Sequence, residues 1–123
     1  TRNGNRVFFA GGELRAHDGG AFGGDAMALV QNFHLDYAVL STAAISADHG
    51  FMLFDLDEAR FSRAIMQQAK TTIVAADARK FGRIAPITVG DPAQVALLVT
   101  DEPPPAALAE ALRGWGTKIK IAP

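Results

Sequence analysis

The sequence predicts an α/β fold with an open, mostly parallel sheet flanked by helices. Two segments, TTIVAAD at 71–77 and VALLVTD at 95–101, are almost continuously apolar, which is typical of parallel strands that are covered on both faces. Segments with helical spacing of apolar residues alternate with these strands, and the connections between them are short. This alternation favours parallel strand pairs joined by helices.

In the first third of the chain, the pattern of apolar residues predicts one short helix between two strands. RVFFA at 6–10 is a candidate buried strand, and it ends in a turn at Gly11–Gly12. The glycine-rich stretch at 18–25 is expected to be flexible, and apolar residues at helical spacing then predict a helix over 25–33. DYAVLST at 36–42 predicts the next strand. Neither glycine segment has the spacing of a dinucleotide fingerprint or a P-loop.

The middle of the chain contains the clearest helix. SADHG at 46–50 is a cluster of turn residues, and short extended pieces are predicted at 51–54 and 85–90. The helix is predicted over 55–70, because it begins with an aspartate followed three residues later by a glutamate, as a capping box does. Its predicted buried stripe consists of Ala59, Phe61, Ala64, Ile65 and Ala69.

The last quarter predicts a helix and a final strand. Pro103–Pro105 interrupts the chain after the second apolar strand and can start a helix over 106–113. Gly114 and Gly116 are expected to end that helix. KIKIA at 118–122 alternates between polar and apolar residues, so it predicts a final strand.

Composition narrows the classes of function. The chain has 123 residues, 49% of them apolar, and a net charge of −1, so we expect one globular domain without the basic footprint that grips DNA by itself. The absence of cysteine excludes disulfides, thiolate metal sites and thiol catalysis. No apolar run reaches the length of a membrane span, about 18 residues, and no signal peptide is recognised. We therefore expect a cytoplasmic protein with no membrane partner.

The stretch VAADARKFGR, which follows the first core strand, is the main candidate for a ligand site. Lys80 carries a compact charge with three donors that suits a phosphate oxygen, and Arg83 can add a second cation. Asp77 can accept hydrogen bonds from a sugar hydroxyl or hold Lys80 in place. A solvated loop with a capping aspartate explains the same spacing equally well. The position at the carboxyl end of a parallel strand favours a site.

Three other groups of residues are weaker candidates. Glu58 and Arg63 can face the same cavity as Lys80 from the start of the long helix, although a cap and a solvated basic face explain them as well. Ser41 and Thr42 end a strand, so they can offer hydroxyls to a ligand or cap a turn.

Arg15, just after the first turn, either reaches a ligand or is exposed. The three histidines are scattered without metal-ligand spacing, so no metal or cofactor is expected.

Several motifs together resemble the effector-binding domain of DeoR-type bacterial transcription repressors. They are AGGELR, DEARFSRA, the D-x-R-K-F-G-R pattern of DARKFGR, and LVTDEPPP, in this order along nearly the whole chain. Within that family, the pattern is most similar to regulators of the glycerol-3-phosphate regulon. The chain lacks an initiator methionine, so residues 1–123 are expected to be a sensor domain cut from a longer protein.

The resemblance implies a fold related to ribose-5-phosphate isomerase and the CoA transferases, here without its first strand and helix. It implies a phosphorylated sugar or polyol as effector, with glycerol-3-phosphate as the first candidate, and a winged helix-turn-helix upstream that supplies all contact with DNA. A homo-oligomer is also expected. The pocket positions that it implies are Ser41, Thr42, Glu58, Arg63, Asp77 and Lys80.

The sequence departs from the family pattern at two glycine positions. Ala44 stands where family members usually have a glycine, and Asp48-His49 stand where they often have a second one. The family's phosphate loop, a glycine followed by two threonines, is expected upstream of residue 1, so part of the phosphate site is expected to lie outside this sequence.

Two alternatives to a sensor remain open. A sugar-phosphate isomerase with the same fold needs carboxylates for proton transfer, and the acidic turn of the isomerases aligns with STAAIS at 41–46, which has no carboxylate. A module that only oligomerises needs no ligand, and GGAFGGDAMALVQNF could supply subunit contacts. A positively charged pocket around Lys80 would favour the sensor, and a flat, solvated Lys80 would favour the module.

Overall fold

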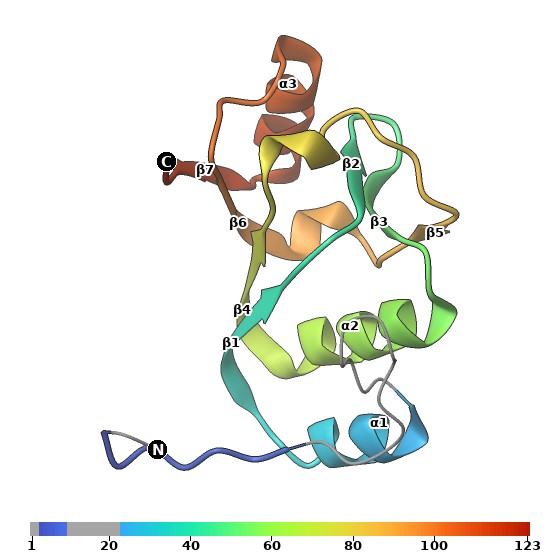
Figure 1. Ribbon diagram of the computed structural model, residues 1–123, viewed down its shortest axis with the longest axis vertical. Helices are drawn as coiled ribbons and strands as arrows, with labels where there is room; N and C mark the ends of the chain where they lie inside the picture. The colour runs from blue at the N-terminus through green and yellow to red at the C-terminus, as the bar shows by residue number, and fades with distance from the viewer. Residues whose placement is uncertain (1–2, 10–22) are drawn as a thin grey trace.

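A computed structural model describes residues 3–9 and 23–123 of the chain, which contain two sheets and three helices (Figure 1). The larger sheet has four parallel strands in the order β1 (Leu35–Leu40), β4 (Ala69–Ala75), β6 (Val95–Thr100) and β7 (Lys118–Ile121). The smaller sheet is antiparallel, in the order β2 (Ala44–Ser46), β3 (Gly50–Leu53) and β5 (Ile87–Thr88). The helices are α1 (Gly24–Val30), α2 (Leu56–Gln68) and α3 (Ala106–Trp115). The prediction of an open parallel α/β sheet is confirmed.

The helix α2 begins as the sequence predicts, with Asp55 as the N-cap that accepts a hydrogen bond from the Glu58 N–H at 3.3 Å. Its buried face differs from the predicted stripe, because Ala59, Ser62 and Met66 are buried whereas Phe61 is only partly covered. The helix ends at Gln68, and its C-cap Ala69 is also the first residue of β4, so no loop separates the two elements.

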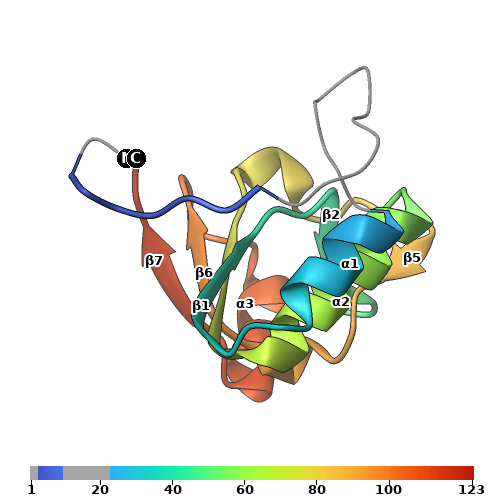
Figure 2. The same cartoon turned by 90° about the horizontal axis from the view of Figure 1, so that it is seen from below.

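The main core lies between the parallel sheet and the helices α2 and α3. In Figure 2 both helices lie on the same side of this sheet. Leu98 of β6 and Leu112 of α3 are fully buried there, together with Val74 and Met66. Each such side chain stabilises the fold by roughly 1.5–3 kcal/mol through burial.

The other face of the parallel sheet is not covered by a helix within the described part of the chain. Tyr37 and Val39 of β1 are 67% and 69% exposed on it. Their neighbours across the sheet in the register, Thr71, Ile73 and Leu97, are partly covered. The expectation of cover on both faces concerned 71–77 and 95–101, and their residues Thr71, Ile73 and Leu97 are partly covered here, whereas the edge strand β1 is exposed. The helix α1 packs against α2.

The first predicted strand is also absent. Residues 6–9 of RVFFA form no strand, and Phe9 is 92% exposed. Phe8 instead packs against Phe33, with ring centroids 5.5 Å apart and the rings tilted by 59°, so this segment packs beside α1 and does not pair with the sheet. Ala10, the Gly11–Gly12 turn and most of the stretch at 18–25 lie outside the described residues.

The small sheet was not predicted as a sheet, because its strands are only two to four residues long. It connects to α3 through the rings of Phe51 and Trp115, whose centroids are 6.0 Å apart. Gly116 ends α3 with φ +77°, whereas Gly114 lies inside the helix and does not end it. No helix in the described part of the chain is long and apolar enough to cross a membrane.

Candidate functional site

The carboxyl ends of three neighbouring strands form one edge of the parallel sheet (Figure 1). Leu40 of β1 pairs with Val74 of β4, and Ala75 of β4 pairs with Val99 of β6. Ser41 and Thr42 therefore follow β1 at this edge, and the segments that begin at Asp77 and Asp101 follow β4 and β6. This is the edge at which open α/β sheets bind their ligands.

A single turn of 3-10 helix, η1 (Ala78–Lys80), carries Lys80 directly after β4. Asp77 is its N-cap, and the Lys80 N–H donates to the Asp77 carbonyl oxygen at 3.1 Å. The turn is then fastened to the small sheet, because the Gly82 N–H donates to the Ile45 carbonyl oxygen of β2 at 2.9 Å. The backbone that presents Lys80 is thus bonded at both ends.

The Asp77 carboxylate is engaged by Arg79. Its Oδ1 accepts from the Arg79 backbone N–H at 2.9 Å and from Nε at 3.0 Å, and Oδ2 accepts from Nη2 at 3.0 Å. These hydrogen bonds lower the pKa of Asp77 to about 2, and the same ion pair raises the pKa of Arg79. The sequence suggested a sugar hydroxyl or Lys80 as the partner of Asp77, and Arg79 was overlooked.

Lys80 is partly covered by its surroundings. Within the described residues its ammonium has no hydrogen-bond or ion-pair partner, although its charge is near enough to lower the pKa of Asp77 slightly. An ammonium without a partner in this part of the chain can bind an anion at this edge.

A hollow of about 420 Å³ lies beside η1, and its lining does not include Lys80. The lining residues are Asp77, Ala78, Arg79, Asp101 and Glu102. With three carboxylates and one guanidinium, which is already bound to Asp77, this hollow does not suit a phosphate dianion.

Ser41 and Thr42 differ in their availability. Ser41 is exposed, so its hydroxyl can reach a ligand. Thr42 is 6% exposed, and its Oγ1 lies 2.9 Å from the Met52 carbonyl oxygen and 3.1 Å from that of Ala44. The cavity that both residues line has a volume of about 10 Å³, which is room for one water at most.

Glu58 and Arg63 lie on α2 beside the small sheet. The Arg63 Nη2 donates to the Thr88 carbonyl oxygen of β5 at 3.1 Å. The loop of Lys80 is bonded to β2, and β2 and β5 are the opposite edges of that sheet. Arg63 and the Lys80 loop thus contact different strands of the small sheet, and a pocket shared by their two side chains stays a prediction.

The two remaining arginines of the predicted set contribute less to the described geometry. Arg83 is exposed and follows Gly82, whose φ of +73° turns the chain after η1. Arg15 lies outside the described residues.

Comparison with known proteins identifies the family. The model of the family described as the DeoR C-terminal sensor domain matches residues 1–102. This chain belongs to the DeoR sensor domain family. The family prediction made from the motifs is thereby confirmed.

The relatives of this DeoR sensor domain are transcriptional repressors. The glycerol-3-phosphate regulon repressor of Escherichia coli is 36% identical over 116 residues, which cover 94% of this chain and 46% of that protein. The HTH-type transcriptional repressor CsqR of Escherichia coli is 40% identical over 107 residues, covering 87% of this chain and 41% of that protein. This DeoR sensor domain thus spans about half the length of the curated relatives that it matches.

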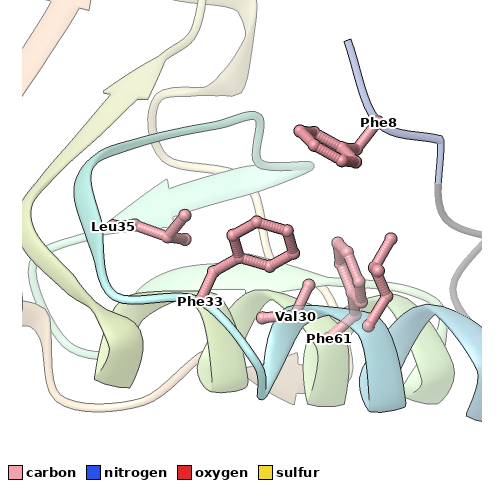
Figure 3. A pocket seen from close by; sticks show the side chains of 6 residues that line it. Phe8, Val30, Phe33, Leu35 and Phe61 are labelled. Atoms are coloured by element: carbon pink, nitrogen blue, oxygen red, sulfur yellow. The ribbon is translucent and has the colours of Figure 1, made fainter. Parts of the chain in front are cut away.

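A second hollow of this DeoR sensor domain, of about 360 Å³, is apolar (Figure 3). Its lining consists of Phe8, Leu29, Val30, Phe33, Leu35 and Phe61. Figure 3 shows Phe33, Val30 and Phe61 directed toward a common space below Phe8. These side chains offer no polar group to a sugar hydroxyl or a phosphate, so this hollow does not suit the expected effector.

The described residues of this DeoR sensor domain, 3–9 and 23–123, contain no group of three or more metal-ligating side chains. The polar groups that follow the strand ends are the Lys80 ammonium, the Ser41 and Thr42 hydroxyls, the ion pair of Asp77 with Arg79, and the carboxylates of Asp101 and Glu102. Such a set can bind and orient a phosphate ester, and in neutral water the Asp77 carboxylate is too weak a base to take a proton from carbon.

Proposed function

We propose that this DeoR sensor domain binds a phosphorylated sugar or polyol and thereby controls DNA binding by the helix-turn-helix part of a longer, cytoplasmic, homo-oligomeric repressor. Glycerol-3-phosphate is the first candidate, because relatives at 36% identity are named for its regulon. The net charge of −1 supports the view that this domain does not itself hold DNA.

The observation that supports binding is the Lys80 ammonium, which has no partner among the described residues and sits at the carboxyl edge of the sheet. The backbone around it is bonded on both sides, so that binding does not first have to order the loop. Ser41 of the neighbouring strand end offers an exposed hydroxyl. We propose Lys80 for the phosphate and Ser41 for a second oxygen of the ligand.

The remaining predicted residues have different places in this proposal. Asp77 shapes the turn through Arg79, and Thr42 holds the end of β1. Glu58, Arg63, Arg83 and Arg15 remain predictions for the wider pocket.

A bound phosphate changes DNA affinity only if it prefers one arrangement of the repressor over another. A shift from 1:99 to 99:1 requires a preference of about 5.5 kcal/mol. Two hydrogen bonds to a charged phosphate supply roughly 1.5–3 kcal/mol each. One hydrogen bond from Lys80 and one from Ser41, if made in only one of the two arrangements, therefore supply much of the preference that a complete switch requires.

We further propose that the domain is not a sugar-phosphate isomerase. That reaction requires a carboxylate beside the substrate that can accept a proton. Residues 41–46, STAAIS, contain no carboxylate. The Asp77 carboxylate at the same edge has a pKa of about 2 and is bound to Arg79. Isomerase turnover by the full-length protein would contradict this part of the proposal.

The test is calorimetric titration of the full-length repressor with glycerol-3-phosphate and with unphosphorylated glycerol. We expect binding of the phosphate ester only, weakened at least tenfold in Lys80→Gln, the factor that corresponds to about 1.4 kcal/mol. Lys70→Gln is the matched control, because Lys70 is exposed at the opposite end of the same strand and pairs with Asp36 at 3.7 Å. Equal losses in both variants, or no binding of any phosphorylated sugar or polyol, would refute the proposal.

A further inference from the structure

The carboxylate of Asp101 is bonded to the loop of a neighbouring strand. Its Oδ1 accepts a hydrogen bond from the Ala78 N–H at 2.8 Å, and Ala78 is the first residue of η1. Asp101 follows β6, whereas η1 follows β4. This bond therefore crosses between two strand ends and fixes the start of the turn that presents Lys80.

The three backbone N–H groups of η1 donate hydrogen bonds to Asp77 and Asp101. Asp77 accepts from Arg79 and, through its carbonyl oxygen, from Lys80. The Ala78 N–H remains for Asp101. All three N–H groups of the turn are thus satisfied by the two aspartates that end β4 and β6. A substitution that removes the side-chain oxygen of Asp101 leaves the Ala78 N–H without this acceptor and loosens the turn at its first residue.

We propose that Asp101 is a positioning residue for effector binding, which orients Lys80 through its hydrogen bond to the Ala78 N–H. The inference rests on the proposed role of Lys80 in binding a phosphate ester. Asp101 is proposed to orient Lys80 and not to attract the phosphate itself. Its negative charge repels a phosphate and so weakens the attraction of this edge for the ligand. The benefit of the hydrogen bond must therefore exceed that repulsion.

Two substitutions separate the hydrogen bond from the charge. Asp101→Asn removes the charge and keeps an oxygen that can accept from the Ala78 N–H, whereas Asp101→Ala removes both. Glu102→Gln is the control for the charge alone, because Glu102 has no hydrogen bond among the described residues and lies next in the chain. Asp101 is exposed, so neither change disturbs the core.

The experiment measures two quantities in the full-length repressor. Hydrogen exchange of the peptide that spans 76–83, without ligand, reports the order of the turn. Calorimetry with glycerol-3-phosphate reports the dissociation constant. We expect Asp101→Ala to speed exchange and weaken binding, each about tenfold. Asp101→Asn and Glu102→Gln are expected to bind as tightly as the wild type or more tightly.

Each other outcome overturns the inference. Unchanged exchange in Asp101→Ala shows that the bond does not order the turn. Faster exchange with unchanged affinity shows that the order of the turn does not matter for binding. An equal loss of affinity in Asp101→Asn shows that a neutral acceptor for the Ala78 N–H does not support binding, so the hydrogen bond is not the cause. If the wild type binds no phosphate ester, the proposed function and the binding half of the inference both fail, and exchange alone decides whether Asp101 orders the turn.

Discussion

The Thr42 hydroxyl donates a hydrogen bond to the Met52 carbonyl oxygen at 2.9 Å and thereby ties the end of β1 to β3. The same oxygen of Met52 also accepts from the Ala43 N–H at 2.9 Å. Thr42 is thus part of the junction between the two sheets. Its buried hydroxyl is used inside the protein, in contrast to the exposed hydroxyl of Ser41.

We therefore expect Thr42→Val to lower the free energy of unfolding by about 1 kcal/mol, since one buried hydrogen bond is lost. Thr42→Ser keeps the hydroxyl and is expected to fall between Thr42→Val and the wild type. Ser41→Ala should stay within about 0.5 kcal/mol of the wild type, as surface changes usually do. Urea unfolding measures all three. A Thr42→Val protein as stable as the wild type would show that the bond does not contribute.

The Asp77 pair with Arg79 predicts a pH dependence at acid pH. The folded pKa of Asp77 is about 2, below the ordinary value of 3.8, because Arg79 bonds to the carboxylate. A lowered pKa stabilises the folded state at a pH above the unfolded value, and the contribution is lost as the pH falls through the folded value. We expect this loss between about pH 4 and pH 2.

Substitution of Arg79 with methionine should raise the pKa of Asp77 toward its ordinary value. A titration of the Asp77 carboxyl carbon by NMR measures this shift directly. Arg83→Met is the control, because Arg83 makes no bond to Asp77. A pKa of Asp77 that stays near 2 without Arg79 would assign the shift to another group.

The two glycines near the end of α3 predict effects of opposite sign. Gly116 has φ +77°, and an added Cβ would meet no atom within 4 Å, so the cost of Gly116→Ala lies in the backbone conformation alone. We expect a loss of about 1 kcal/mol. Gly114 lies within the helix with the same open space around it. Gly114→Ala should therefore stabilise the protein by about 0.5–1 kcal/mol.

Thermal or urea unfolding of the two alanine variants, measured side by side, shows whether each change raises or lowers the free energy of unfolding. Destabilisation by both changes would mean that Gly114 also ends the helix, as the sequence alone suggested.

The hydroxyl of Thr100 is buried without a hydrogen-bond partner in the described structure. Thr100 is 3% exposed at the end of β6. A buried polar group without a partner destabilises a protein by roughly 1–3 kcal/mol. Thr100→Val keeps the shape and removes the hydroxyl, so we expect a higher free energy of unfolding. A lower stability of Thr100→Val would reveal a partner such as an ordered water.

Long, regular patterns in the sequence predicted the matching elements correctly. The apolar runs at 71–77 and 95–101 became β4 and β6, with β4 shifted by two residues, and the capping box predicted the start of α2. RVFFA had the composition of a strand, but composition does not show whether a partner strand lies beside it. Strands of two to four residues, such as β2 and β5, are too short to produce a period.

The site was predictable only in part, for a similar reason. The carboxyl ends of the strands follow from the order of the elements, and this placed Asp77, Lys80 and Ser41 at one edge. The side-chain partners depend on the loop conformation, so the bond from Arg79 to Asp77 was missed. Spacing along a helix likewise did not show that Arg63 bonds to Thr88 of β5, and the place of Arg63 in a pocket with Lys80 stays a prediction.

Trp115, which contacts Phe51, is an intrinsic fluorescent probe. Trp115 is the sole tryptophan of the chain, and it joins the end of α3 to the small sheet that also holds the Lys80 loop. If a metabolite shifts α3 relative to that sheet, the indole environment changes and the emission of this one fluorophore shifts with it. The motion can thus be followed in the unlabelled domain, without a dye and without DNA.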